Sequence, residues 1–218
     1  MRSASETRRR LARAVVLVGV ALSTGRARAD GTEPSYGRVA GDVTVVVGAG
    51  AVFDARGGRA EGEVRLRYLD SAGLFAAYED APVIGSSAPT ARVLATGLEL
   101  RPLFLFRWLR GQETHRAWMD LTLDSFGLEL GATFQQPSGG TFGSQRGVAA
   151  GLGLEVPILP DATGPWIGIH GGLRWSEEAL ASGDVNSSGA RTAYVAITLA
   201  WHQVVIAHVV DVGDEAPR

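Results

Sequence analysis

Hydrophobic side chains recur at every second position through most of the sequence between Val39 and His208. In the stretch 42–54 every odd position is apolar, whereas the even positions carry Asp, Thr, Gly and Val. Residues 63–68 alternate charged with large apolar side chains. A repeat of two is typical of β-strands with two unlike faces. The sequence therefore predicts strands with one apolar face and one face that is small, polar or charged.

The same alternation runs through 94–108, 147–158, 165–176 and 191–202. Between residues 118 and 134 its phase shifts at Asp124–Ser125, which predicts a β-bulge, because a bulge inserts one extra residue into a strand. A short helix over residues 118–123 is the alternative interpretation. Pro102 interrupts the segment 94–108 on its apolar side and indicates a bend or bulge there.

The alternating segments predict about eight strands, and the pattern allows eight to ten. Their expected ranges are 39–54, 60–69, 74–80, 91–108, 116–134, 147–158, 165–176 and 191–210. After the first link, longer and shorter connections alternate, and the longer ones are rich in Gly, Ser and Pro. An even number of strands, with short turns on one side and longer loops on the other, is typical of membrane-spanning barrels. We therefore predict an all-β fold, a single antiparallel up-and-down β-barrel.

The first 29 residues have the features of a secretory signal peptide. Five arginines precede the apolar run 14–22, and Ala27-Arg28-Ala29 places small residues before Asp30. The apolar run is well short of the roughly 20 residues that a membrane-spanning helix needs. We expect a signal peptide at 1–29, an N-terminal tail at 30–38, a barrel domain at 39–211 and a C-terminal tail at 212–218.

The charge balance argues against a nucleic-acid partner. All 21 basic residues are Arg, and seven of them lie in residues 1–29, which leaves 14 Arg against 22 Asp and Glu in the remainder. Binding to phosphate backbones requires a basic patch, and no cluster of arginines follows Arg28. The chain has no cysteine, which excludes disulfides, thiolate metal sites and thiol catalysis.

Few residues form a motif that carries chemistry. The stretch 45–52 resembles the start of a dinucleotide-binding loop, but Phe53 stands where the third glycine would be required. The four histidines lack the spacing of metal ligands. His170 and Ser176 suggest a barrel hydrolase, but six residues of extended strand separate them by roughly 20 Å. We therefore expect no enzyme activity, no cofactor and no metal site.

The export signal, the alternation and the loop pattern together resemble the small outer-membrane β-barrels of Gram-negative bacteria, over most of residues 39–210. The resemblance implies that the apolar positions face lipid and the others face the lumen. An eight-stranded barrel is about wide enough for side chains to fill, and charges inside it must pair. We expect a filled lumen with an ion-pair network of Glu63, Arg65, Arg67, Glu99, Arg101, Arg107, Glu155 and Arg174.

Large aromatic residues lie near the predicted strand ends. At such positions they form the belts by which barrels meet the membrane–water interface. The alternative is that they fill the core of a β-sandwich. We expect an interfacial belt of Tyr68, Trp108, Trp118, Trp166, Trp175 and Trp201.

Two functional hypotheses follow from this pattern. The first is a monomeric outer-membrane barrel with a structural or surface-interaction role, in contact with outer-membrane lipid, whose loops 81–90, 135–146 and 177–190 face outward to meet a ligand or protein partner. The second is a soluble periplasmic or secreted barrel or sandwich that binds an apolar small molecule inside. Alternation alone does not distinguish them. Glycines crowd the polar parity at 48, 50, 151, 153, 168 and 172, which favours the narrow lumen of a membrane barrel.

Overall fold

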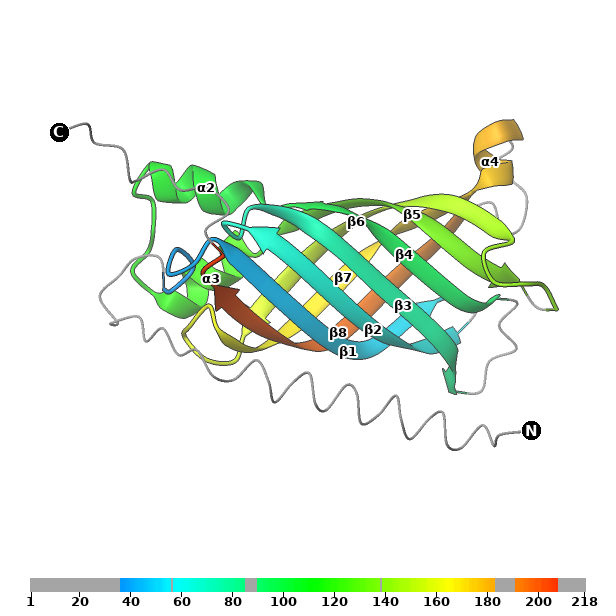
Figure 1. Cartoon of the computed structure of the whole chain (residues 1–218), viewed down its shortest axis with the longest axis horizontal. Helices are drawn as coiled ribbons and strands as arrows, with labels where there is room; N and C mark the ends of the chain where they lie inside the picture. The colour runs from blue at the N-terminus through cyan, green and yellow to red at the C-terminus, as the bar shows by residue number, and fades with distance from the viewer. Residues whose placement is uncertain (1–35, 56, 85–89, 138, 183–190, 208–218) are drawn as a thin grey trace.

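In a computed structural model of the chain, the described residues are 36–55, 57–84, 90–137, 139–182 and 191–207. They form eight strands and three short helices, labelled as in Figure 1. The strands are β1 (Val43–Asp54), β2 (Gly57–Tyr68), β3 (Ala72–Ile84), β4 (Thr90–Leu100), β5 (Gly127–Pro137), β6 (Gln145–Pro157), β7 (Gly164–Ser176) and β8 (Arg191–Val205). The helices are α2 (Pro102–Leu109), α3 (Ala117–Asp124) and α4 (Glu177–Ser182).

The eight strands close into a single barrel in the order of the chain. Each strand pairs antiparallel with the next, and β1 closes the barrel by pairing with β8 from Val43 opposite Val205 to Asp54 opposite Tyr194. The predicted fold, a single antiparallel up-and-down barrel of eight strands, is confirmed.

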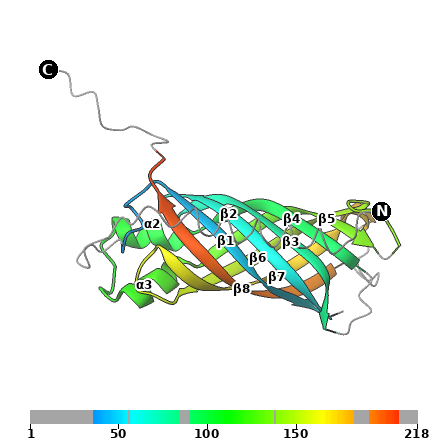
Figure 2. The same ribbon diagram turned by 60° about the horizontal axis from the view of Figure 1, so that its bottom comes forward.

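The two ends of the barrel differ. At one end, called here the α3 end, β1 begins, β8 finishes, and α2 and α3 lie beside the rim (Figure 1). The second view also shows α2 and α3 together at this end (Figure 2). The other end, called the α4 end, carries α4. Residues 101–126 therefore form a helical hairpin, called here the α2–α3 hairpin, on the same side as the start of β1.

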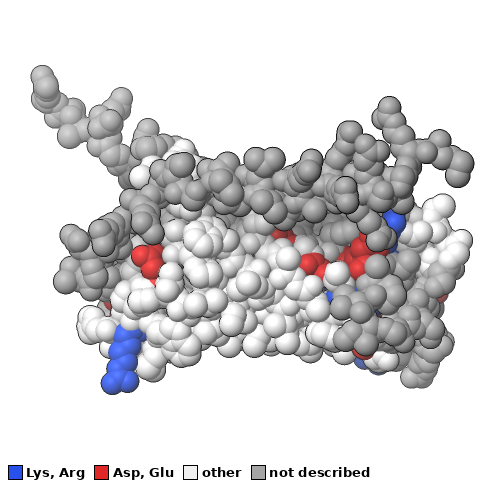
Figure 3. All heavy atoms as spheres, turned by 90° about the horizontal axis from the view of Figure 1, so that it is seen from below, with Lys and Arg blue, Asp and Glu red and all other residues white. Residues whose placement is uncertain are grey.

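The apolar parity faces outward. Leu66 is 47% exposed, Leu152 is 51% exposed and Ile169 is 46% exposed, and the neighbouring strands present further Leu, Ile and Val side chains in the same way. Figure 3 shows one face of the molecule, on which uncharged residues form most of the described surface. The hypothesis of a barrel that binds an apolar molecule inside requires the apolar side chains to face inward. The structure contradicts that hypothesis, because these side chains face outward.

The lumen is filled with charged and small residues. Seven of the arginines and glutamates predicted to line it are at most 6% exposed. Val46, Phe75 and Val93 are also buried there, together with glycines. Two of those glycines lie against His170: a Cβ on Gly153 would stand 2.7 Å from Nδ1, and one on Gly168 would stand 2.8 Å from Nε2. The glycines of the inner parity therefore make room for the charged side chains.

The segment between β4 and β5 differs from the prediction. The strand expected over 91–108 ends at Leu100, and α2 begins at Pro102. Proline is favoured at the first helical position, because the missing N–H has no partner there in any case. The β-bulge expected at Asp124–Ser125 is wrong. Residues 117–124 form α3, in agreement with the alternative interpretation, and β5 begins only at Gly127.

These helices also change the pattern of links. The expected alternation placed only short turns on the side where the first strand begins and the last strand finishes. The link 101–126 lies on that side and is longer than 69–71 and 158–163. The loops predicted to face outward, 81–90, 135–146 and 177–190, all meet at the α4 end, although residues 85–89, 138 and 183–190 lie outside the described residues. The expected signal peptide at 1–29 and the C-terminal tail at 212–218 also lie outside them.

Candidate functional site

The lumen contains a network of buried ion pairs. At its middle, Arg65 on β2 donates hydrogen bonds to Glu63 at 2.8 Å, to Glu99 at 3.2 Å and to Glu129 at 2.6 Å. These carboxylates come from β2, β4 and β5, so one guanidinium joins three strands. An arginine suits this arrangement, because its guanidinium presents five N–H donors in a fixed plane.

Nearer the α3 end, a second group is centred on Glu155 of β6. Arg67 donates to Glu155 at 2.7 Å and to Glu99 at 3.1 Å. Arg101, just after β4, donates to Glu155 and, at 2.9 Å, to Glu99. Asp70, in the turn after β2, also accepts a hydrogen bond from Arg101 at 3.4 Å. Two arginines therefore share two carboxylates across the barrel.

Toward the α4 end, Glu79 of β3 is fully buried and pairs with two arginines. Arg59 donates to Glu79 at 3.0 Å and to Asp54 at 2.8 Å. Arg174 of β7 donates to Glu79 and lies over the ring of Tyr194, 4.0 Å from its centroid. A buried charge is tolerated only when it is paired and hydrogen-bonded, and each of these guanidinium groups meets that condition.

Two histidines belong to the same network. His170 Nδ1 lies 2.9 Å from a carboxylate oxygen of Glu129 and 3.2 Å from Arg65. His202 Nε2 lies 3.4 Å from Glu155, and its ring stacks on Trp166. Both imidazoles therefore lie among the charged groups that face the lumen.

The structure brings together seven of the eight residues expected in the network: Glu63, Arg65, Arg67, Glu99, Arg101, Glu155 and Arg174. Arg107 is the exception. It lies in α2, outside the barrel, and pairs with Asp120 and Asp124 of α3. Its assignment to the lumen followed from a strand over 91–108, and it fails because that strand ends at Leu100.

Sequence reasoning missed several partners in the network, namely Asp54, Arg59, Asp70, Glu79, Glu129, His170 and His202. Glu129 alternates with Leu128 and Leu130, so the parity alone would have found it. Glu79 lies near the end of the short segment expected over 74–80, and Arg59 precedes the segment expected over 60–69. The boundaries of those segments, rather than the alternation, concealed them.

The α3 end is closed by an end plug, defined as residues 36–42 together with α3. The Tyr36 hydroxyl donates to Asp120 at 2.8 Å, and Arg38 donates to Asp124 at 2.5 Å. Arg107 of α2 pairs with both of these carboxylates. The guanidinium of Arg38 also lies 4.1 Å from the centroid of the Phe104 ring. The segment 36–38 is thus tied to the α2–α3 hairpin, which lies more than 60 residues further along the sequence.

Asp120 is the most heavily bonded acid of the end plug. Burial acts to raise its pKa, but hydrogen bonds from the backbone N–H of Thr114 and from the side chains of Arg107, Tyr36 and Thr114 lower the pKa to about 2. Burial and the bond to Asp120 raise the pKa of Tyr36 to about 12. The arrangement therefore favours an ionised carboxylate beside a neutral phenol.

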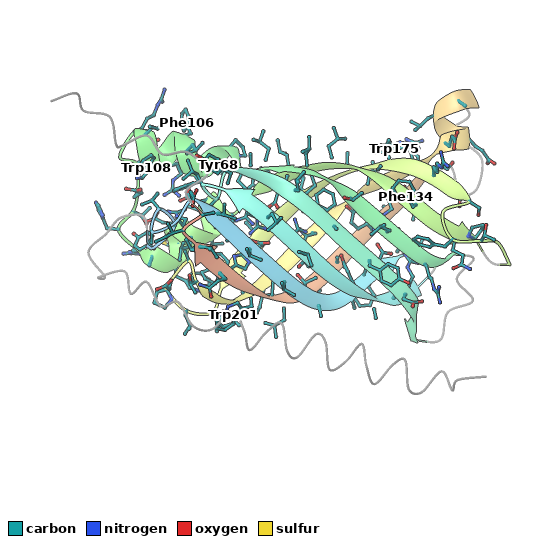
Figure 4. All side chains as sticks on the ribbon, in the orientation of Figure 1. Tyr68, Phe106, Trp108, Phe134, Trp175 and Trp201 are labelled. Atoms are coloured by element: carbon teal, nitrogen blue, oxygen red, sulfur yellow. The ribbon has the colours of Figure 1, made fainter. Side chains whose placement is uncertain are left out.

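Five of the six aromatic residues expected at the interface lie on the outer surface or at its margins. Figure 4 places Tyr68, Trp108 and Trp201 toward the α3 end and Trp175 toward the α4 end. Trp118 in α3 is 53% exposed, and its indole N–H donates to the carbonyl oxygen of Pro157. Trp166 does not belong to the belt. It is 2% exposed, because its parity on β7 is that of Gly168 and His170.

The geometry brings no nucleophile to a histidine at the positions considered from the sequence. His170 contacts Glu129 and Arg65, whereas the Ser176 hydroxyl accepts a hydrogen bond from the backbone N–H of Ala179 in α4. Within the described ranges, no group of three or more His, Asp or Glu side chains is arranged to hold a metal ion. Across the same residues, no helix combines the length and apolar character needed to cross a membrane.

Comparisons with known proteins add little to this description. No family model matches the chain, and no curated protein matches it. Among solved structures, the chain is similar to the solution NMR structure of the de novo designed TMB2.3. The two share 14% sequence identity with a TM-score of 0.37, and the match covers 74% of this chain and 93% of the designed one. The fold assignment rests on the strand pairing described above.

Proposed function

We propose that this chain is an outer-membrane β-barrel protein of a Gram-negative bacterium, with its apolar outer surface in lipid and a lumen sealed by ion pairs. The α4 end faces the outside of the cell, where loops 81–90, 135–146 and 177–190 meet a ligand or protein partner. Its role is structural or one of surface interaction, exerted by a monomer, and it includes no catalysis or cofactor.

The observation that carries this proposal is the distribution of side chains, which is the reverse of that in a soluble protein. Charged side chains are buried in the lumen, while large apolar side chains on the strands are about half exposed. Soluble monomers rarely present contiguous apolar patches above a few hundred Å². A lipid environment removes this cost, and a closed barrel satisfies the backbone hydrogen bonds that lipid cannot satisfy.

The filled lumen supports the proposal that the barrel does not conduct ions or small solutes. Arg65, Arg67, Glu99 and Glu155 come from three strands and pair across the centre. The end plug closes one mouth, since Leu121 of α3 packs on the buried Trp166. Reconstituted in vesicles, the protein should leave an entrapped fluorescent dye inside.

The decisive experiment compares two arginine substitutions. Ile169 lies near the middle of β7 on the outer face, and Leu180 is an exposed apolar residue of α4 beyond the strands. Ile169→Arg should lower barrel stability in lipid vesicles by about 2–4 kcal/mol, the cost of a cation at the bilayer midplane. Leu180→Arg should change it little. Unfolding by urea in vesicles measures both.

Cell fractionation gives the second test. The protein should require detergent for extraction from the outer-membrane fraction and should migrate differently on gels before and after heating. Recovery in the soluble periplasmic extract, with equal effects of the two arginines, would refute the proposal.

A further inference from the structure

Charged residues border the apolar outer surface at different places at the two ends of the barrel. At the α4 end this border lies on the strands themselves: Asp80 and Arg92 form an exposed pair across β3 and β4, and Arg146 and Arg191 stand on the outer face of β6 and β8. At the α3 end the outward positions remain apolar to the rim. Among the described strand residues of that half, none that faces outward is charged.

Aromatic residues show where each boundary falls. At the α4 end, Phe134 stands opposite Arg146 and Trp175 opposite Arg191 on paired strands, so each aromatic residue has an arginine as its cross-strand partner on the outer face. The comparable pairing at the α3 end lies beyond the barrel. There Arg110 lies over the ring of Phe106, 4.2 Å from its centroid, within the α2–α3 hairpin. Aromatic rings beside polar heads are typical of a membrane interface.

The hairpin continues the apolar surface of the strands. On α2, Phe106 is 49% exposed and Leu109 is 75% exposed, and on α3, Trp118 and Leu123 are 53% and 45% exposed. In Figure 4, Phe106 and Tyr68 both lie toward the α3 end. The apolar surface therefore passes from the strands to the helices without a charged border between them.

The distribution around the barrel axis distinguishes lipid from a protein partner. α2 follows β4, and α3 packs on α2 and beside β6, where Trp118 donates a hydrogen bond to the carbonyl oxygen of Pro157. Exposed apolar side chains therefore follow the rim from the end of β4 to β6. The link 158–163 adds the exposed Ile158 and Leu159. A protein partner would cover one side, whereas lipid surrounds the whole circumference. The polar link 110–116 between the helices, with Arg110 and Arg116 exposed, ends this apolar surface.

We propose that the lipid-contacting surface extends beyond the barrel onto the α2–α3 hairpin, so that the link 110–116 lies at the level of the phospholipid head groups. Arg110 and Arg116 then face lipid phosphates, which a guanidinium binds with two parallel hydrogen bonds. This inference rests on the proposed function, since it assumes that the strands cross a bilayer. It assigns to the hairpin a lipid contact in the leaflet at which β1 begins and β8 finishes.

The absence of cysteine allows the test to use single spin labels in the full-length protein. The labelled variants are Leu109→Cys in α2, Gln112→Cys in the link, Ile169→Cys on the outer face of β7 and Leu180→Cys in α4. Each is reconstituted in vesicles of phosphatidylcholine with phosphatidylglycerol, and its folding is verified by heat-modifiable gel mobility. Spectra are recorded with oxygen, which concentrates in lipid, and with a water-soluble nickel chelate.

The Leu109 label should collide more with oxygen than with nickel, as the Ile169 label does, and the Gln112 and Leu180 labels should show the opposite preference. If Leu109 prefers nickel while Ile169 prefers oxygen, the barrel is in the membrane and the hairpin is not, which overturns this inference alone. If Ile169 also prefers nickel, the proposed function fails. Low collision with both reagents at Leu109 indicates a protein contact and also overturns the inference. Should Leu109→Cys not fold, Leu123→Cys on α3 replaces it.

Discussion

Trp166 stacks face to face on His202 at the α3 end of the lumen, with ring centroids 4.5 Å apart and planes 5° apart. On one side of this pair, His202 approaches Glu155 and the ion-pair network. On the other side, Leu121 of α3 packs against Trp166. The stacked pair is therefore the contact through which the end plug meets the charged interior.

Truncation of Trp166 should be costly. Replacing it with Ala removes a buried indole and leaves a cavity between the plug and the network, so Trp166→Ala should lower the free energy of unfolding by about 3–5 kcal/mol. The matched control is Trp201→Ala, at a position 45% exposed on the outer face of β8. Urea unfolding in detergent micelles measures both. Equal losses for the two tryptophans would contradict the buried role of Trp166.

The Glu155 carboxylate should be needed for stability. Glu155→Gln removes one of the two carboxylates that Arg67 and Arg101 share and should cost about 3–5 kcal/mol, because two buried cations are then left with one shared carboxylate, that of Glu99. Asp80→Asn is the control, since the side chains of the Asp80–Arg92 pair are about half exposed and such pairs contribute about 0–1 kcal/mol. Thermal unfolding in micelles provides the comparison. A small effect at Glu155 would mean that water reaches the network.

The lumen should not accept larger side chains beside His170. A Cβ on Gly168 would stand 2.6 Å from the Thr198 hydroxyl oxygen and 2.8 Å from His170 Nε2, so Gly168→Val should overpack the lumen and cost about 1–3 kcal/mol or more. Gly62→Ala is the control, since nothing lies within 4 Å of a Cβ there. The yield of heat-modifiable barrel after refolding reports both. Normal refolding of Gly168→Val would show that the lumen has spare volume.

The end plug should weaken in acid. Because the folded state holds the pKa of Asp120 at about 2, below the ordinary value of 3.8, its ionisation stabilises the fold above about pH 4, and this contribution is lost as the pH falls toward 2. The stability advantage of the wild type over Asp120→Asn should therefore shrink by about 2 kcal/mol between pH 5 and pH 2. Urea unfolding of both proteins at each pH gives the difference, from which carboxylates common to both proteins largely cancel. A constant difference would show that the carboxylate of Asp120 is not the group that titrates.

The alternation predicted the strands because each outward side chain is apolar and each inward one is small or charged. It failed at residues 101–126, where Pro102 and the phase shift near Asp124 were taken as distortions of a strand. Period-two and helical patterns overlap in short apolar runs, so periodicity alone does not distinguish them. The aromatic residues of α2 extended the strand pattern by chance, and this brought Arg107 wrongly into the lumen.

The alternation predicted which charged residues face the lumen, but it did not predict which of them form ion pairs. Arg65 reaches Glu129, which is 64 residues away in the sequence, because the register of four successive strands brings them to the same level. That register depends on strand boundaries that the sequence locates only approximately. The end plug was not predicted at all, since Tyr36 and Arg38 showed no pattern that indicated a partner.

The pairing of β1 with β8 makes the order of strands cyclic: Val43 and Val205 are neighbours although they begin and end the barrel sequence. A circular permutant that joins the chain beyond β8 to the start of β1, and opens it between β3 and β4, would keep all eight strand pairings. The finished barrel has no first strand. The direction in which the chain is synthesised matters for how the barrel forms, and not for what holds it together afterwards.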